Sequence, residues 1–202
     1  MSFLRLAGAA AALLSLGLFA RAAPTLFAPI QINLLACANP IADHMNKLLE
    51  SGIVVKLQAC LNADSLVQAK ADIEICLDLI KACCAELAKI GAVNIEGKAQ
   101  AEIVACVAAL ITLFVKVCLQ LTIKFGASAV AAIIVEIDLA LKLLLSTLGV
   151  CVNGIVALVL KALVSFTVDL MPELNLNLCA SILAKVGVNI GVIAGVDMSV
   201  AN

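Results

Sequence analysis

The sequence is poor in the side chains on which enzymes and nucleic-acid-binding proteins depend. Its 202 residues include no Trp, no Tyr, six Phe and one histidine, His44. Without Trp and Tyr, almost no side chain is left to stack on bases or sugars, and one histidine offers little for general acid–base catalysis. The sequence contains no phosphate-binding loop, dinucleotide-binding motif or calcium loop. We therefore expect no enzymatic activity, no cofactor, no metal site and no nucleic-acid partner.

Charge is also scarce. Charged residues make up 13% of the chain and hydrophobic residues 64%, with a net charge of −1, whereas ordinary domains have about 25% charged residues. The most charge-poor stretch is Ala99–Leu170, which includes 18 consecutive uncharged residues, Leu143–Leu160. So long an apolar block must be buried in a protein core, a membrane or an assembly.

The first 22 residues have the pattern of a secretory signal peptide. Arg5 precedes the apolar run Leu6–Ala20, and Ala20-Arg21-Ala22 is an A-x-A cleavage site. An N-terminal membrane anchor is the alternative, but this run is shorter than the roughly 20 residues that span a bilayer. We expect a secreted or cell-surface protein, with a membrane location as the alternative.

All nine cysteines follow that cleavage site, so we expect them in an oxidising compartment, where they would form disulfides. Nine is an odd number, which leaves one thiol free or bonded to another chain. The alternative is that each cysteine is a small buried hydrophobic residue. No C-x-x-C pair occurs and His44 is far from the Cys83-Cys84 doublet, so the pattern does not indicate zinc. The disulfide candidates are Cys37, Cys60, Cys76, Cys83, Cys84, Cys106, Cys118, Cys151 and Cys179.

Apolar periodicity predicts about five helices after an extended, proline-containing lead-in at residues 23–39. Asn39 and Asp64 or Ser65 are predicted N-caps, and Gly52 is a candidate break in the first helix. We expect His44 to be an exposed helix residue. The predicted helices are Pro40–Leu61, Ser65–Ile90, Lys98–Phe125, Ser128–Leu148 and Asn153–Leu170.

The charges divide these helices into two kinds. The second helix has charged residues over a wide outer face, whereas each later helix has one narrow polar ridge, including a predicted Asp138–Lys142 pair in the fourth. In the third helix the ridge consists of Lys98, Glu102, Thr112, Lys116, Gln120 and Lys124. We therefore predict an all-α, disulfide-tied bundle at residues 40–186, with an amphipathic first half, a very apolar second half and a flexible apolar tail at 187–202.

The layout of the chain resembles a known group of proteins. A signal peptide, an amphipathic first half with Cys60, Cys76 and Cys83-Cys84, and a Leu/Val/Ala-rich second half are similar to small secreted proteins of mushroom-forming fungi. Those proteins are associated with aerial hyphae and attachment, alongside hydrophobins. Hydrophobins themselves have eight cysteines with two doublets, unlike this chain. The resemblance implies a role at the cell wall or cell surface and assigns no functional residue.

Three functions fit this sequence. We favour a non-enzymatic, surface-active structural protein that works at the cell wall or another water–apolar boundary and associates with itself. The first alternative is an integral membrane protein with helices in residues 99–170, for which Leu143–Leu160 is the best span. The second is a secreted lipid-binding carrier, because the Cys83-Cys84 doublet is similar to that of plant lipid-transfer proteins. No C-x-C follows that doublet, however, and the chain is about twice too long for that family.

Overall fold

Side chains cap the first helices where the sequence predicts it. The computed structural model describes residues 30–163 and 165–193. Helix α3 (Pro40–Glu50) begins after Asn39, whose side-chain oxygen accepts the Ala42 N–H at 2.9 Å. Helix α5 (Leu66–Ile90) begins after Ser65, whose hydroxyl accepts the Gln68 N–H at 3.2 Å. Both predicted helix starts are confirmed, with Ser65 rather than Asp64 as the cap.

The regular secondary structure of the described residues is all helical, with no strand among them, which confirms the predicted all-α class. The described part of the chain has eight helices rather than about five. Two predicted helices are each divided in two, and a further helix follows near the C-terminus. The remaining helices are α4 (Ile53–Leu61), α6 (Gly97–Phe125), α7 (Ala127–Cys151), α8 (Ile155–Ala162), α9 (Ser165–Glu173) and α10 (Asn177–Ile193).

The two divisions have different origins. Gly52, with a φ of 84°, separates α3 from α4, because an L side chain rarely adopts this left-handed conformation. The sequence indicated this break. It did not indicate the second, where Leu163 is extended and the chain bends by 98° between α8 and Thr167–Glu173. No glycine or proline occurs at this bend, so no local residue explains it. The bend instead follows from packing, because α8 lies on α6 and both α8 and α9 lie on α10.

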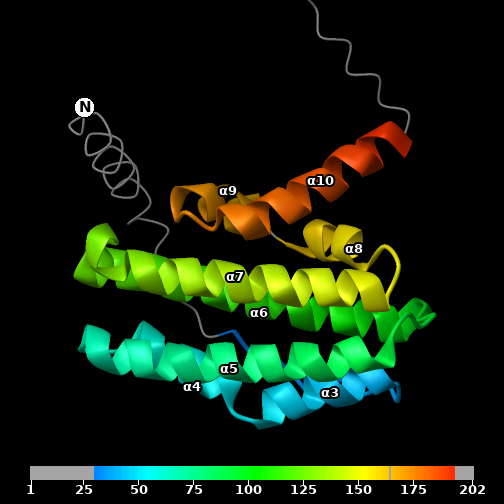
Figure 1. Ribbon diagram of the computed structural model, residues 1–202, viewed down its shortest axis with the longest axis horizontal. Coiled ribbons are helices and arrows are strands. Elements are labelled where there is room, and N and C mark those ends of the chain that lie inside the picture. Colours follow the sequence, from blue (N-terminus) through cyan, green and yellow to red (C-terminus); the bar gives the residue numbers. More distant parts are fainter. Residues whose placement is uncertain (1–29, 164, 194–202) are drawn as a thin grey trace, which may run out of the picture. The chain divides into compact units, whose positions relative to one another are not determined.

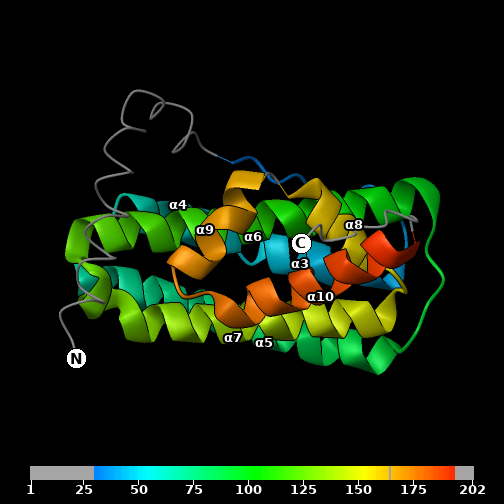
Figure 2. The same cartoon turned by 90° about the horizontal axis from the view of Figure 1, so that it is seen from above.

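Three long helices, α5, α6 and α7, lie side by side, with shorter helices on two sides of them (Figures 1 and 2). Helices α3 and α4 pack against α5, and α8 and α10 lie on the opposite side, against α6 and α7. Helices α5 and α7 are parallel neighbours, because Cys151 at the end of α7 donates its thiol to the Leu87 carbonyl near the end of α5 at 3.3 Å. These helices belong to the unit Gln31–Asn202.

Helix α6 is the centre of the core. Leu110, Ile111 and Phe114 on this helix are fully buried, and the helix contacts α4, α7 and α8. None of the residues of its predicted polar ridge is buried, so the narrow ridge is confirmed. Desolvation lowers the pKa of Lys116, which lies half-buried on this ridge. The apolar surface of this helix is therefore largely covered by other helices.

Helix α7 differs from the sequence-based prediction at Asp138. The predicted outward pair with Lys142 is wrong, because Asp138 is only 4% exposed. Its two carboxylate oxygens accept the N–H groups of Leu178 and Cys179, each at 2.8 Å. These N–H groups belong to the first turn of α10 and have no partner within that helix. Asp138 therefore caps a helix that begins about forty residues later in the chain.

Three predicted boundaries are also corrected. Leu143–Leu160 is not one span, because α7 ends at Cys151 and α8 begins only after Gly154. Gly149 lies within α7 rather than ending it. Helix α10 continues to Ile193, beyond the predicted start of the tail at residue 187, because a glycine lowers helix propensity without stopping an established helix. The predicted signal peptide and residues 194–202 lie outside the described residues.

Candidate functional site

The nine cysteines are free thiols in the structure, so the predicted disulfide-tied bundle is not supported. All nine lie within the described residues, and eight of them are buried. They are distributed over most of the helices: Cys60 on α4, Cys76, Cys83 and Cys84 on α5, Cys106 and Cys118 on α6, Cys151 on α7 and Cys179 on α10, with Cys37 in the lead-in. In this structure the cysteines are small buried hydrophobic residues, which was the alternative interpretation of the sequence.

The buried thiols are poor nucleophiles. Desolvation by burial raises the pKa of Cys60, Cys76, Cys83, Cys106, Cys118 and Cys179 from 9.0 to about 12, and that of Cys84 to about 11. A thiol reacts through its thiolate, and these thiols stay protonated near neutral pH. Their positions therefore give no support to catalytic or redox chemistry.

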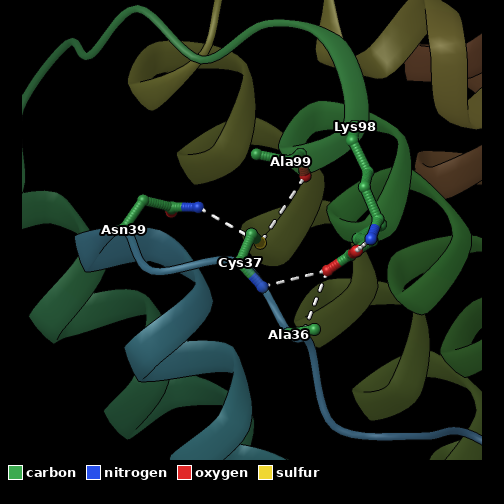
Figure 3. Close-up of polar contacts among 6 residues, drawn as sticks. Ala36, Cys37, Asn39, Lys98 and Ala99 are labelled. Carbon is green, nitrogen blue, oxygen red and sulfur yellow. Dashed lines mark hydrogen bonds and ion pairs between the residues drawn. The ribbon is translucent and has the colours of Figure 1, made fainter.

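Cys37 is the one half-buried thiol, and it belongs to a structural contact (Figure 3). Glu102 on α6 accepts the N–H groups of Ala36 and Cys37 at 2.9 and 3.1 Å. Asn39 donates to the Cys37 sulfur at 3.3 Å, and that thiol donates to the Ala99 carbonyl at 3.9 Å. Desolvation, followed by the neighbouring Glu102 carboxylate, raises the pKa of Cys37. The arrangement therefore stabilises a neutral thiol.

The same contact holds the lead-in against two helices. Besides its bonds to Glu102, the lead-in exchanges two hydrogen bonds with Asn46 on α3 through the backbone of Leu35, at 2.7 and 3.0 Å. Desolvation acts to raise the pKa of Glu102, but hydrogen bonds from Cys37 and Ala36 and the Lys98 ammonium, at 3.6 Å, lower it overall. Residues 30–39 contain no helix or strand. This segment is a strap across α3 and α6, and its contacts are structural.

His44 lies on α3 and is half-buried rather than exposed. The described contact with a nucleophile involves its backbone, because the His44 carbonyl accepts the Cys83 thiol at 3.7 Å. The imidazole therefore does not activate Cys83 in this arrangement. Among the described residues, no group of three or more His, Cys, Asp or Glu side chains could hold a metal ion.

The feature that stands out is the outward face of α7. From residue 131 to residue 150, the exposed positions form one continuous stripe with only two charges, Glu136 and Lys142. We call this face the α7 stripe. It has four large apolar side chains that are between 42% and 71% exposed: Val135, Leu139, Leu143 and Val150. The other exposed positions are Ala131, Ala132, Ser146 and Gly149.

Sequence reasoning missed this stripe because it placed Asp138 and Lys142 on the same outward line. At 100° per residue, Asp138 lies 100° from Leu139, which is enough to move it from the outward face to the buried one. The spacing of Val135, Leu139 and Leu143 was visible in the sequence. In a helix this apolar, however, the spacing alone did not show which side faces outward.

The structure also has surface pockets. One, of ≈ 770 Å³, is lined by residues 92–96 of the α5–α6 connection and 149–153 around the α7–α8 turn. A second, of ≈ 430 Å³, lies between α6 and α8 and includes Val104 and Leu158. Both are open to solvent, unlike the enclosed apolar cavity that a lipid carrier needs.

One helix in the described part of the chain, α6, is long and apolar enough to cross a membrane, with a mean hydropathy of 2.3 over its most apolar window. Of that window, 72% is buried inside the protein. The bent pair of α8 and Thr167–Glu173 reaches the same threshold only when it is counted as one broken span. The central helix of a folded core has these same properties.

No protein family, no characterised protein and no solved structure matches this chain. Any function of this protein must therefore be inferred from the described residues alone.

Proposed function

We propose that the protein is a secreted, non-enzymatic, surface-active structural protein. It would work at a boundary between water and an apolar phase, such as a cell-wall surface, air or lipid, and associate with itself there. The observation that supports this proposal is the α7 stripe, which has four large apolar side chains and only two charges in twenty residues.

The energy of such a contact is appreciable. Burying an exposed Val or Leu side chain completely gives about 2 kcal/mol. The four large side chains of the α7 stripe are about half exposed on average, so transfer of each to an apolar phase gives about 1 kcal/mol. A gain of about 4 kcal/mol from one helix face, without unfolding, favours adsorption at an apolar boundary.

A membrane protein is the second candidate, and the length and apolar character of α6 favour it. A carrier has less support, because the described pockets are open. Fractionation of the producing cells separates these functions. We expect the protein in the culture medium without detergent. Its restriction to detergent-extracted membranes would support the membrane protein, and a stoichiometric lipid in an organic extract would support the carrier.

Adsorption at an air–water surface tests the role of the α7 stripe. In the double variant Leu139→Glu/Leu143→Glu, we expect surface pressure to rise more slowly and to a lower plateau than in the unmodified protein. The matched control is Val67→Glu/Ile75→Glu, which adds the same charge at two exposed apolar positions on α5, 81% and 44% exposed. Equal losses in the two double variants would contradict the proposal, as would full adsorption of the α7 variant.

A further inference from the structure

Two of the surface pockets lie end to end along α6. The pocket of ≈ 430 Å³ between α6 and α8 and a pocket of ≈ 290 Å³ between α6 and the strap are both lined by Ala105, so they form one groove. We call it the α6 trough. We propose that the α6 trough binds a long-chain fatty acid in its carboxylate form, with the carboxylate beside Lys161 and the acyl chain along α6.

The floor of the α6 trough consists of small residues. Gly97, Ala101, Ala105 and Ala109 are spaced four residues apart and form one row on α6, of the kind that winds slowly around a helix. At 1.5 Å per residue the row is about 18 Å long, which is close to the length of an extended long-chain acyl group. Because these residues are small, a chain that lies along the row meets no large side chain beneath it.

Apolar side chains from three segments line the rest of the α6 trough. They are Val104 on α6, Leu158 on α8, and Ile32 and Leu34 on the strap. Leu34 is 54% exposed, so it has apolar surface left to cover. Pockets for small molecules are mostly apolar, with a few polar groups that fix the orientation of the ligand. The α6 trough has this composition, and its shape suits one unbranched apolar chain.

The pocket between α6 and α8 favours an anion. Lys161 is the one charged side chain among its lining residues, and it forms no ion pair with the described part of the chain. The side-chain amide of Gln100 is a further hydrogen-bond donor in this pocket. Gly97, which also lines it, is the first residue of α6, so the positive end of that helix dipole lies here.

The pocket beside the strap has the opposite charge. Glu102 lines it, and the Glu102 carboxylate accepts the N–H groups of Ala36 and Cys37 and pairs with Lys98 at 3.6 Å. A second carboxylate placed here would be repelled by Glu102, whereas an acyl chain carries no charge. The two pockets therefore orient the fatty acid, with its carboxylate near Lys161 and its acyl chain toward the strap.

The α6 trough is open to solvent, so one side of a bound acyl chain stays in water. We therefore expect weak, reversible binding rather than the stored cargo of a carrier. The inference does not rest on the proposed function. Figure 2 shows the strap and α8 beside α6, on the opposite edge of the bundle from α7, so the α6 trough and the α7 stripe are separate surfaces.

Isothermal titration with laurate, below its micelle-forming concentration, tests the position of the site. Ala101→Phe puts a large side chain on the floor of the α6 trough and should raise the dissociation constant at least about tenfold. Ala101 is exposed, so this change leaves the core intact. The matched control is Ala132→Phe, at an exposed alanine of α7, which should leave the constant unchanged. No binding by the unmodified protein, or equal weakening in the two variants, would overturn the inference.

The same titration tests the role of charge. Lys161→Gln should raise the dissociation constant for laurate roughly threefold to tenfold, because it removes an exposed attractive charge. Lys142→Gln removes the same charge from an exposed position on α7 and should leave the constant unchanged. Dodecyltrimethylammonium, which has an alkyl chain of similar length and a cationic head group, should bind the unmodified protein at least about tenfold more weakly than laurate. Equal affinity for laurate and this cation would overturn the assignment of a carboxylate ligand.

The inference and the proposed function fail separately. A protein that adsorbs through the α7 stripe but does not bind laurate would overturn the fatty-acid site alone. Laurate binding that is weakened by Ala101→Phe, in a protein whose adsorption ignores Leu139→Glu/Leu143→Glu, would overturn the surface-active function alone.

Discussion

Helices α5 and α7 are the same length, 25 residues each, and lie side by side in parallel, yet their outward faces have opposite character. Both bury an apolar face against the rest of the bundle. The exposed face of α5 has six charged residues, Lys70, Glu74, Asp78, Lys81, Glu86 and Lys89, whereas that of α7 between residues 131 and 150 has two.

The charges on α5 contribute little to the fold. Its surface pairs, such as Lys70–Glu74 at 3.7 Å and Asp78–Lys81 at 3.3 Å, are exposed, and exposed pairs of this kind are worth at most about 1 kcal/mol. Their physical effect is to keep α5 hydrated. The fold requires apolar residues on the packed side of each helix. The outward side is free to differ between the two helices, so residues that serve a function can lie there.

The largest effect on stability should come from raising the pH, because both helices contain buried thiols. Seven thiols have a pKa of about 11 or 12 in the folded protein, against 9.0 when exposed. Below pH 9 both states bind the proton. Above it only the folded state does, so stability falls as pH rises, by about 1.4 kcal/mol per pH unit for each thiol. We expect cooperative unfolding within about two pH units above 9.

Circular dichroism follows this unfolding, and the thiolate absorbance should rise with it. Because the protein has no Tyr, no phenolate absorbance overlaps the thiolate signal. As a control, a thiol reagent without reductant should detect Cys37 readily in the folded protein and all nine thiols after denaturation. A fold that persists well above pH 11 would contradict the expected loss of stability, and fewer than nine thiols after denaturation would show that some of these cysteines are not free.

The next largest effect on stability should come from removing the buried carboxylate of Asp138 on α7. Asp138→Ala leaves the N–H groups of Leu178 and Cys179 without their acceptor, at a cost of about 3 kcal/mol in the free energy of unfolding. Asp78→Ala on α5 removes an exposed carboxylate and should cost less than about 0.5 kcal/mol. Urea denaturation measures both values. Similar losses in the two variants would mean that Asp138 does not cap α10.

The smallest effect on stability should come from making α5 resemble α7. Asp78→Leu/Lys81→Leu removes one exposed ion pair and should change the free energy of unfolding by less than about 1 kcal/mol. The same change should increase adsorption at the air–water surface, because a second helix face becomes apolar. Surface pressure and urea denaturation check the two outcomes. No increase in adsorption would show that an apolar helix face is insufficient for surface activity.

Local signals in the sequence predicted much of the fold. Asn39, Ser65 and Gly126 mark helix ends through their own side chains or backbone, so their effect needs no knowledge of the rest of the chain. The polar ridge of α6 was also predictable, because 100° per residue is enough to place it. These are properties of single helices.

Properties that depend on several helices were not predictable. Asp138 is buried because α10 offers two N–H groups, and nothing near Asp138 in the sequence indicates this. The bend at Leu163 likewise depends on packing. The disulfide prediction followed from an assumed compartment and a count of cysteines, and neither determines whether two thiols meet. The α7 stripe became visible only when the buried side of α7 was known.

The cap that Asp138 provides also orders the events of synthesis. The chain grows from its N-terminus, so α7 is complete before Leu178 and Cys179 exist. Helix α10 contains Gly187 and Gly191, which lower its helix propensity, and the carboxylate that satisfies its first turn is forty residues upstream. Helix α10 therefore forms as it packs against α7 rather than by itself. Until α10 leaves the ribosome, the nascent bundle has an open side along α7, which exposes it to aggregation at that stage of synthesis.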